Sequence, residues 1–115
     1  MRKQSYLSVF LATATVLAGA SAFAADDVKA LWIQNCASCH GEDGKAATKV
    51  GQLLKVRSLL DPEVRAKFDR ERMINATKQG IPQEGSSKMA MKGYADKLTD
   101  EQIAALIDYI YALGN

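Results

Sequence analysis

The sequence predicts a small all-α fold, and three observations carry this prediction. Apolar residues recur at three- and four-residue spacing in residues 28–35 and again in residues 103–113, which is the pattern of amphipathic helices. Helix-start signals stand at Asp61-Pro62 and at Thr99. No stretch of the chain indicates a strand, and the segments between the expected helices are predicted to be loops.

Residues 1–24 are typical of a cleaved export signal. Arg2 and Lys3 form a basic start, residues 6–18 are apolar apart from small hydroxyl side chains, and Ala22-Phe23-Ala24 matches the small-x-small cleavage pattern. We therefore expect cleavage after Ala24, export to the periplasm and a single domain over residues 25–115. An uncleaved leader that anchors the chain is the alternative, because the uncharged stretch over residues 4–25 approaches the length that spans a bilayer.

The charge balance argues against nucleic acid as a partner. The chain has 15 basic and 13 acidic residues, a net charge of +2, and the leader contains two of the basic residues and none of the acidic ones. The mature chain is therefore formally neutral, with 13 residues of each sign, and it has no basic stripe. A domain of about 90 residues is marginally stable without help, so a buried cofactor would supply much of its core.

The first helix is expected to begin at Asp26 and Asp27, because acidic residues are favourable at a helix N-terminus. Val28, Leu31 and Trp32 follow at helical spacing, and Trp32 is predicted to be a core aromatic.

This helix leads directly into Cys36-Ala37-Ser38-Cys39-His40, the attachment pattern for c-type haem. Each thiol would add to one of two vinyl groups on one porphyrin edge, and one turn of helix-like backbone brings Cys36 and Cys39 to the same side. His40 would then provide the proximal nitrogen to the iron. Since the motif contains both cysteines and the one histidine of the chain, a four-ligand zinc site lacks ligands. A disulfide or a haem-free dithiol protein is the alternative, although a thioredoxin-like domain would need strands.

The middle of the chain is predicted to combine loops with short helices. Residues 41–45 indicate a polar turn, and residues 46–60 an apolar loop that covers a large apolar object. Asp61, as an N-cap before Pro62, predicts one short helix, and Asp69 predicts a second that Gly80 ends. The charged residues here, among them Arg65, are expected to form a solvent-exposed face. Residues 81–93 are again predicted to be a loop, and they contain two methionines.

The last helix has the clearest signals. Thr99 and Gln102 form a capping box, and Leu98 can pack against Ile103. The apolar stripe then continues through Leu106, Ile107, Ile110 and Leu113, and Gly114 ends it.

This order of elements resembles that of the class I cytochromes c, over about Asp26 to Asn115. The resemblance implies that the N- and C-terminal helices cross, with loops that wrap one covalently attached haem c. It also implies that Trp32, four residues before the first haem cysteine, packs against Leu106 and Tyr109. Val28 stands where the family usually has a smaller residue, so the crossing is expected to be somewhat wider.

The resemblance also assigns residues around the haem. Gly51-Gln52 stands where the family favours Gly-Pro, and the Gln52 carbonyl is available to accept a hydrogen bond from the proximal imidazole. Leu54 stands where a haem-contacting leucine is expected.

Met91 is the sixth iron ligand that the resemblance favours. It lies seven residues before Leu98, and Met91-Lys92-Gly93-Tyr94 is similar to the family's Met-x-x-aromatic pattern. Met89 stays open as the alternative ligand, and Met73 is expected to be a core residue of a helix.

Ligation by His40 and Met91 would leave no open position on the iron. We therefore predict an electron carrier and not an enzyme, with one electron exchanged between ferric and ferrous iron. Electrons should pass through the haem edge near the thioethers to transient protein partners, a reductase or dehydrogenase as donor and an oxidase or other acceptor. Lys88, Lys92 and Lys97 would give that face a positive bias. We expect a periplasmic monomer of a respiratory chain that meets a membrane only through partners or an uncleaved leader. A haem-based small-ligand binder is the alternative if the iron lacks a Met ligand.

Overall fold

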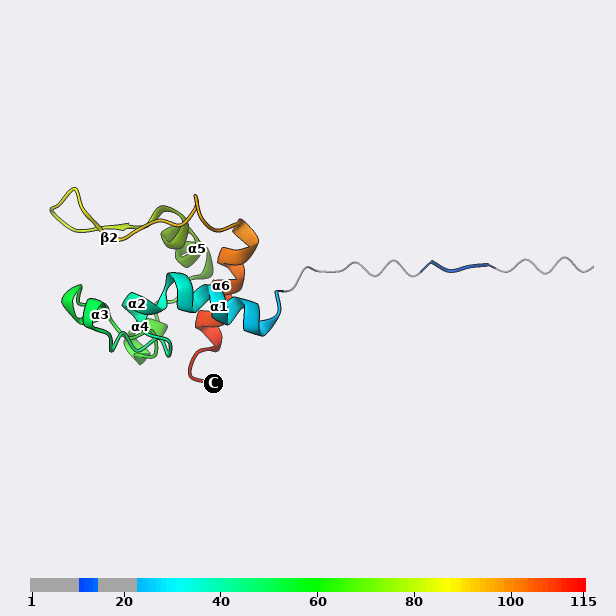
Figure 1. Cartoon of the computed structure of the whole chain (residues 1–115), viewed down its shortest axis with the longest axis horizontal. Coiled ribbons are helices and arrows are strands. Elements are labelled where there is room, and N and C mark those ends of the chain that lie inside the picture. The colour runs from blue at the N-terminus through cyan, green and yellow to red at the C-terminus, as the bar shows by residue number, and fades with distance from the viewer. Residues whose placement is uncertain (1–10, 15–22) are drawn as a thin grey trace, which may run out of the picture.

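A computed structural model describes residues 11–14 and 23–115 of the chain. Most of the predicted leader lies outside these residues, so cleavage after Ala24 stays a prediction. Figure 1 shows the elements in the order α1 (Ala25–Asn35), α2 (Ala37–His40), α3 (Lys49–Leu53), α4 (Pro62–Arg65), α5 (Arg70–Gln79), β1 (Ile81–Pro82), β2 (Met89–Met91) and α6 (Asp100–Ala112). The predicted all-α fold is confirmed. Within the described ranges, no helix has the length and apolar character needed to cross a membrane.

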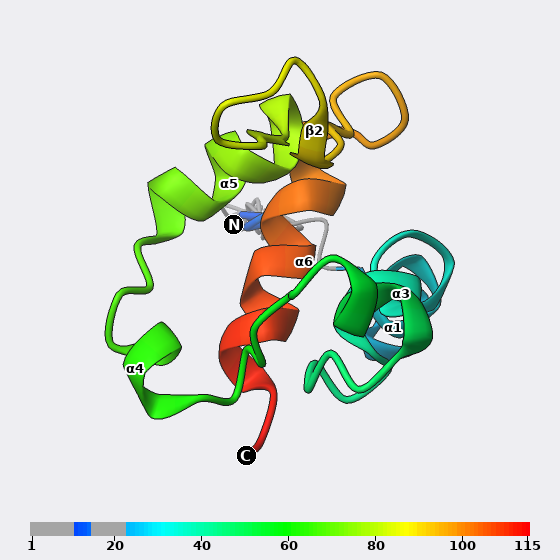
Figure 2. The same cartoon turned by 90° about the vertical axis from the view of Figure 1, so that its left-hand side faces the viewer.

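Helices α1 and α6 cross and pack against each other at the centre of the fold (Figures 1 and 2). Trp32 of α1 is only 1 % exposed and belongs to the same buried cluster as Leu106 of α6. Its ring lies 5.5 Å from that of Tyr109, measured between centroids. The predicted partners of Trp32 are therefore both present, and burial of such large apolar side chains is the main stabilising contribution to the core.

Helix α6 begins as predicted and ends with help from a distant residue. The Thr99 hydroxyl accepts a hydrogen bond from the Gln102 N–H at 3.1 Å, and the Gln102 side chain accepts one from the Thr99 N–H at 2.9 Å. At the other end, the Arg65 guanidinium donates to the Tyr111 carbonyl at 2.9 Å and to the Leu59 carbonyl at 3.1 Å. The prediction that Arg65 belongs to a solvent-exposed charged face is therefore wrong, because carbonyls at a helix C-terminus need donors.

The predicted caps of α4 and α5 are both formed. The Asp61 side chain accepts from the Glu63 N–H, and the Asp69 side chain accepts from the Arg72 N–H, each at 2.9 Å. Helix α1 differs slightly from the prediction, since it begins at Ala25 without a side-chain cap and carries its two aspartates inside the first turn.

Two segments predicted as loops contain regular structure. Thr48 caps α3, because its hydroxyl accepts from the Gly51 N–H at 2.9 Å. Residues 81–91 form an antiparallel hairpin in which Ile81 pairs with Met91 and Pro82 with Met89, with an irregular register between the two pairs. Every residue from Ile81 to Ala90 is exposed. The hairpin therefore lacks the buried face that would have produced an alternating sequence pattern.

Candidate haem-binding site

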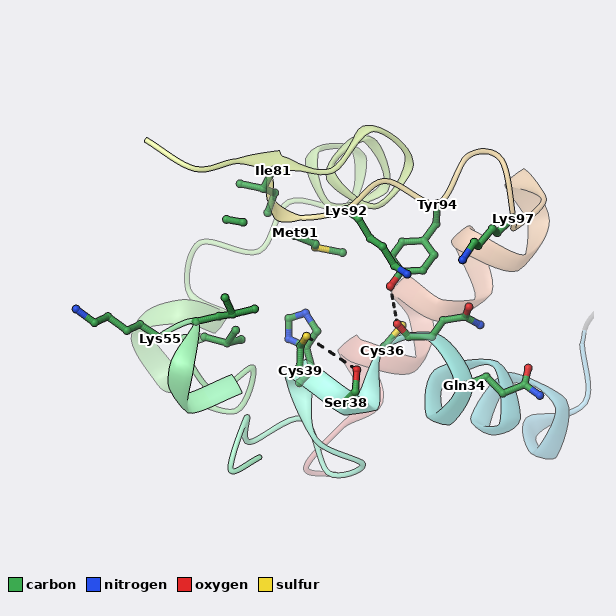
Figure 3. Close-up of a pocket in the computed structure, with 15 residues that line it drawn as sticks. Gln34, Cys36, Ser38, Cys39, Lys55, Ile81, Met91, Lys92, Tyr94 and Lys97 are labelled. Carbon is green, nitrogen blue, oxygen red and sulfur yellow. Dashed lines mark hydrogen bonds between the residues drawn. The ribbon is translucent and has the colours of Figure 1, made fainter. Parts of the chain in front are cut away.

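A cavity of about 610 Å³ lies between the α2–α3 region and the hairpin (Figure 3). Its lining includes Cys36, Cys39, His40 and Met91, which are the four residues that the sequence predicts for the site. The fold thus brings Met91 of β2 to the same cavity as the cysteine–histidine motif, which comes much earlier in the sequence. The volume is within the range of about 300–1,000 Å³ that cofactor sites occupy.

The cysteine motif forms a single helical turn. Helix α1 ends at Asn35, and α2 follows from Ala37 to His40, with the His40 N–H donating to the Cys36 carbonyl at 2.9 Å. Both cysteines are free thiols that line the cavity. This is the spacing that two thioether bonds to one porphyrin edge require.

The environment of Cys36 argues against redox chemistry of the dithiol itself. Burial, aided by the neighbouring Cys39 thiol, raises the pKa of Cys36 to about 11. Dithiol oxidoreductases instead lower the pKa of a cysteine in order to hold a reactive thiolate. Cys36 is therefore a protonated and poorly nucleophilic thiol at neutral pH.

His40 is held as a neutral imidazole. Burial lowers the pKa of His40, so the ring is uncharged at neutral pH and suited to bind a metal. The indole N–H of Trp32 donates to the Gly41 carbonyl at 3.0 Å, which fixes the backbone just after His40. The Nδ1 atom of His40 is buried and has no hydrogen-bond partner among the described residues.

The Gln52 carbonyl is available to accept a hydrogen bond from His40, but among the described residues this bond is not formed. The Gln52 N–H donates to the Thr48 carbonyl at 2.9 Å, a bond that proline could not make, and this bond continues helix α3. The Gln52 carbonyl then accepts from the Lys55 N–H at 3.2 Å. The Gln52 carbonyl is therefore engaged at the C-terminal end of α3, and among the described residues it does not accept a hydrogen bond from His40.

Gly51 allows α3 to lie directly against α2. A Cβ atom at this position would collide with the Cys39 carbonyl and lie 2.8 Å from the Ala46 carbonyl. The Thr48 hydroxyl also donates to the Ser38 carbonyl at 2.7 Å. This close contact brings Leu54, the predicted haem contact, to the cavity lining.

The two candidate methionines occupy different places. Met91 is partly buried and lines the cavity, whereas Met89 is 47 % exposed and is not part of the lining. The structure therefore favours Met91 as the available sulfur ligand. Of the three lysines predicted near this loop, Lys92 and Lys97 line the cavity and Lys88 does not.

Lys55 and Tyr94 also line the cavity, and no sequence pattern indicated their conformation or contacts there. Lys55 lies at the cavity with a left-handed backbone, φ 54°. The Tyr94 hydroxyl donates to the Asn35 carbonyl at 2.7 Å, and the Lys92 Nζ lies 5.2 Å from the centroid of its ring. Burial raises the pKa of Tyr94, so its hydroxyl stays a donor at neutral pH. The Met-x-x-aromatic pattern predicted an aromatic residue at Tyr94, but it did not predict the hydrogen bond to Asn35.

The residues present fit a covalently attached haem. Two thiols lie one turn apart, a neutral imidazole follows them, and a thioether sulfur comes from a separate element. The buried Nδ1 of His40 has no hydrogen-bond partner among the described residues, which indicates that this ring does more than stabilise the fold. Leu54 and Ile81 line the cavity although they are 53 % and 45 % exposed, so an apolar group seated there would cover them.

Comparison with known proteins agrees with this chemistry. A family model described as "Cytochrome C oxidase, cbb3-type, subunit III" matches residues 23–110. The chain belongs to this family of c-type cytochromes. Its cofactor class is therefore covalently bound haem c, and its general role is haem-based electron transfer.

Solved structures of cytochromes c are similar to this one. A protein named KustC0563 c-type cytochrome is 32 % identical, with a TM-score of 0.64, and the match covers 76 % of this chain and 96 % of that chain. A mutant of the same protein is 34 % identical, with a TM-score of 0.62 and coverage of 76 % and 98 %. A search of curated proteins found no match.

Proposed function

We propose that this cytochrome c is a periplasmic one-electron carrier with a single haem attached through Cys36 and Cys39. The observation that carries the proposal is the composition of the cavity. Cys36 and Cys39 face Met91 of the hairpin across the cavity (Figure 3), and His40 lines the same cavity from α2. When bound, haem c supplies the Fe(III)/Fe(II) couple.

The residues of the chain define how this couple is used. Cys36 and Cys39 fix one edge of the group, and His40 offers a neutral nitrogen on the same helical turn. Met91 offers a thioether sulfur, which stabilises the reduced state relative to a second imidazole. If His40 and Met91 both bind the iron, they would leave no coordination position for a substrate, and we therefore propose a carrier and not an enzyme.

The apolar lining supports the same role. Leu54, Val56 and Ile81 line the cavity and would limit the access of water to a group bound there. A low-dielectric surrounding disfavours the extra charge of the oxidised state. Because His40 and Met91 are held by the fold, they would keep the same positions in both oxidation states, so little rearrangement would oppose electron transfer.

Transient, acidic redox proteins are the proposed partners. Lys55, Lys92 and Lys97 line the cavity and give its edge positive charge, which speeds encounter with an acidic surface. The matched family is named for a subunit of a cytochrome c oxidase, which supports an oxidase as one class of acceptor. We propose a monomer that meets these partners briefly.

Visible absorption spectra of the exported protein test the axial ligands. We expect sharp low-spin bands in the reduced state and the weak far-red ferric band of a sulfur-ligated haem. Met91→Ala should abolish the far-red band, and the matched variant Met89→Ala should retain it. A high-spin spectrum of the unaltered protein would contradict the proposal and indicate a small-ligand binder.

The mass of the exported protein tests attachment and processing together. We expect a chain that starts at Ala25 and carries the full mass of one haem. Retention of residues 1–24 would instead support a membrane anchor, and a mass without haem, from a host able to attach it, would support the dithiol alternative.

A further inference from the structure

The hairpin that contains Met91 has few contacts of its own with the rest of the fold. Within the described part of the chain, strand β2 pairs with β1 alone, and all residues from Ile81 to Ala90 are exposed. Such a segment is at the low-stability end of a native structure. Met91 itself pairs with Ile81 and packs against the core cluster, and the chain that follows it provides its further attachments.

The residues after Met91 are attached firmly to α5. The Tyr94 N–H donates to the Thr77 carbonyl at 2.9 Å, and the Ala95 N–H donates to the Lys78 carbonyl at 3.2 Å. Gly93 permits this close approach, since a Cβ atom there would lie 2.5 Å from the Lys78 carbonyl. These bonds fix the backbone three residues beyond Met91, but they do not connect it to the wall that bears the cysteines.

The Tyr94 side chain makes that connection. Tyr94 is 7 % exposed, and its hydroxyl donates to the Asn35 carbonyl at 2.7 Å, directly before Cys36 (Figure 3). Among the described residues, this is the hydrogen bond that joins segment 81–98 to segment 25–60. Asn35 is the last residue of α1, where carbonyls lose their helical partners and accept other donors.

We infer that Tyr94 is a positioning residue that holds Met91 at the cavity by closing the Met91 segment onto the Asn35 carbonyl beside the cysteine motif. This inference rests on the proposed axial role of Met91. If Met91 leaves the cavity, the short chain between Met91 and Tyr94 moves and the Tyr94–Asn35 bond opens, whereas the backbone bonds of Tyr94 and Ala95 to α5 are retained. The Tyr94 hydrogen bond and the Met91–iron bond are then coupled, and loss of one weakens the other.

Imidazole binding to the ferric holoprotein measures this coupling, because imidazole replaces Met91 and removes the far-red band. Tyr94→Phe keeps the buried ring and deletes the hydroxyl alone. Tyr111→Phe is the matched control, since Tyr111 lies at the end of α6, away from the cavity lining. We expect Tyr94→Phe to bind imidazole about three- to tenfold more tightly, the effect of one net hydrogen bond, and Tyr111→Phe to be unchanged.

Thermal unfolding of the same two variants separates positioning from general stability. A lower unfolding temperature for Tyr94→Phe with unchanged imidazole affinity and an unchanged far-red band would overturn the inference and leave Tyr94 a structural residue. An unaltered protein without the far-red band would overturn the proposed Met91 ligation itself, and the inference with it. Tighter imidazole binding by Tyr94→Phe alone supports both.

Discussion

Replacement of Arg65 by alanine should destabilise the fold far more than its surface position suggests. The guanidinium donates to three carbonyls, Tyr111 at 2.9 Å, Leu59 at 3.1 Å and Ile110 at 3.5 Å. It also lies 5.1 Å from the centroid of the Phe68 ring. Charge-assisted hydrogen bonds at a partly exposed site, a cation at a helix C-terminus and a cation–π contact together contribute about 2–3 kcal/mol. Arg65 thereby anchors the α4 region to the end of the helix that crosses α1.

The assay is thermal unfolding of the ferric holoprotein followed by circular dichroism. In a domain of this size, about 1 kcal/mol shifts the unfolding temperature by roughly 4–8 °C, so Arg65→Ala should lower it by about 10–20 °C. Arg57→Ala is the control, because Arg57 pairs only with the carboxylates of Asp61 and Glu63 on the surface, and such pairs contribute little. Equal, small shifts for both variants would refute this account of how α6 ends.

The remaining predictions concern the cavity and the helix start. Gly51→Ala should lower the free energy of unfolding by about 1–3 kcal/mol in urea titrations, because the new Cβ collides with the Cys39 carbonyl; unaltered stability would mean that α3 does not lie against α2. Thr99→Ala should cost about 1 kcal/mol in the same titrations by removing the capping box, whereas the neighbouring exposed Asp96→Ala should not. Replacement of Lys55, Lys92 and Lys97 by glutamine should slow oxidation by the anion ferricyanide and flatten its dependence on salt; an unchanged salt dependence would remove these lysines from the proposed docking face.

The elements that the sequence predicts well are those whose signals are local and periodic. Helix α6 has a capping box and an apolar stripe, and Trp32 lies at a fixed distance from a motif that allows little variation. Helix α3 has Thr48 as its cap but only five residues, too few for an apolar period to appear. The hairpin is exposed at every residue before Met91, so no alternating burial pattern marks its strands.

The contacts that sequence patterns do not identify depend on how distant parts of the chain meet in the fold. Arg65 has the composition of a solvent-exposed face, and only the fold brings the end of α6 to it. Gln52 stands where a family pattern makes a carbonyl available to His40, but that bond is not formed among the described residues. Tyr94 could be recognised as an aromatic after Met91, whereas its partner, Asn35, is a backbone carbonyl that no sequence pattern identifies.

The separation of the two axial residues along the chain affects the order in which the site assembles. Cys36, Cys39 and His40 lie on one helical turn, so they come together without closing a long loop. Met91 must close a loop of about 50 residues to reach them, which costs chain entropy, and it arrives on a segment with little stability of its own. We therefore expect the cysteine–histidine turn to form early during folding and the segment that carries Met91 to reach the cavity last. Under mild denaturant the segment that carries Met91 should likewise leave the cavity first, while the two thioether bonds keep the haem attached to the chain.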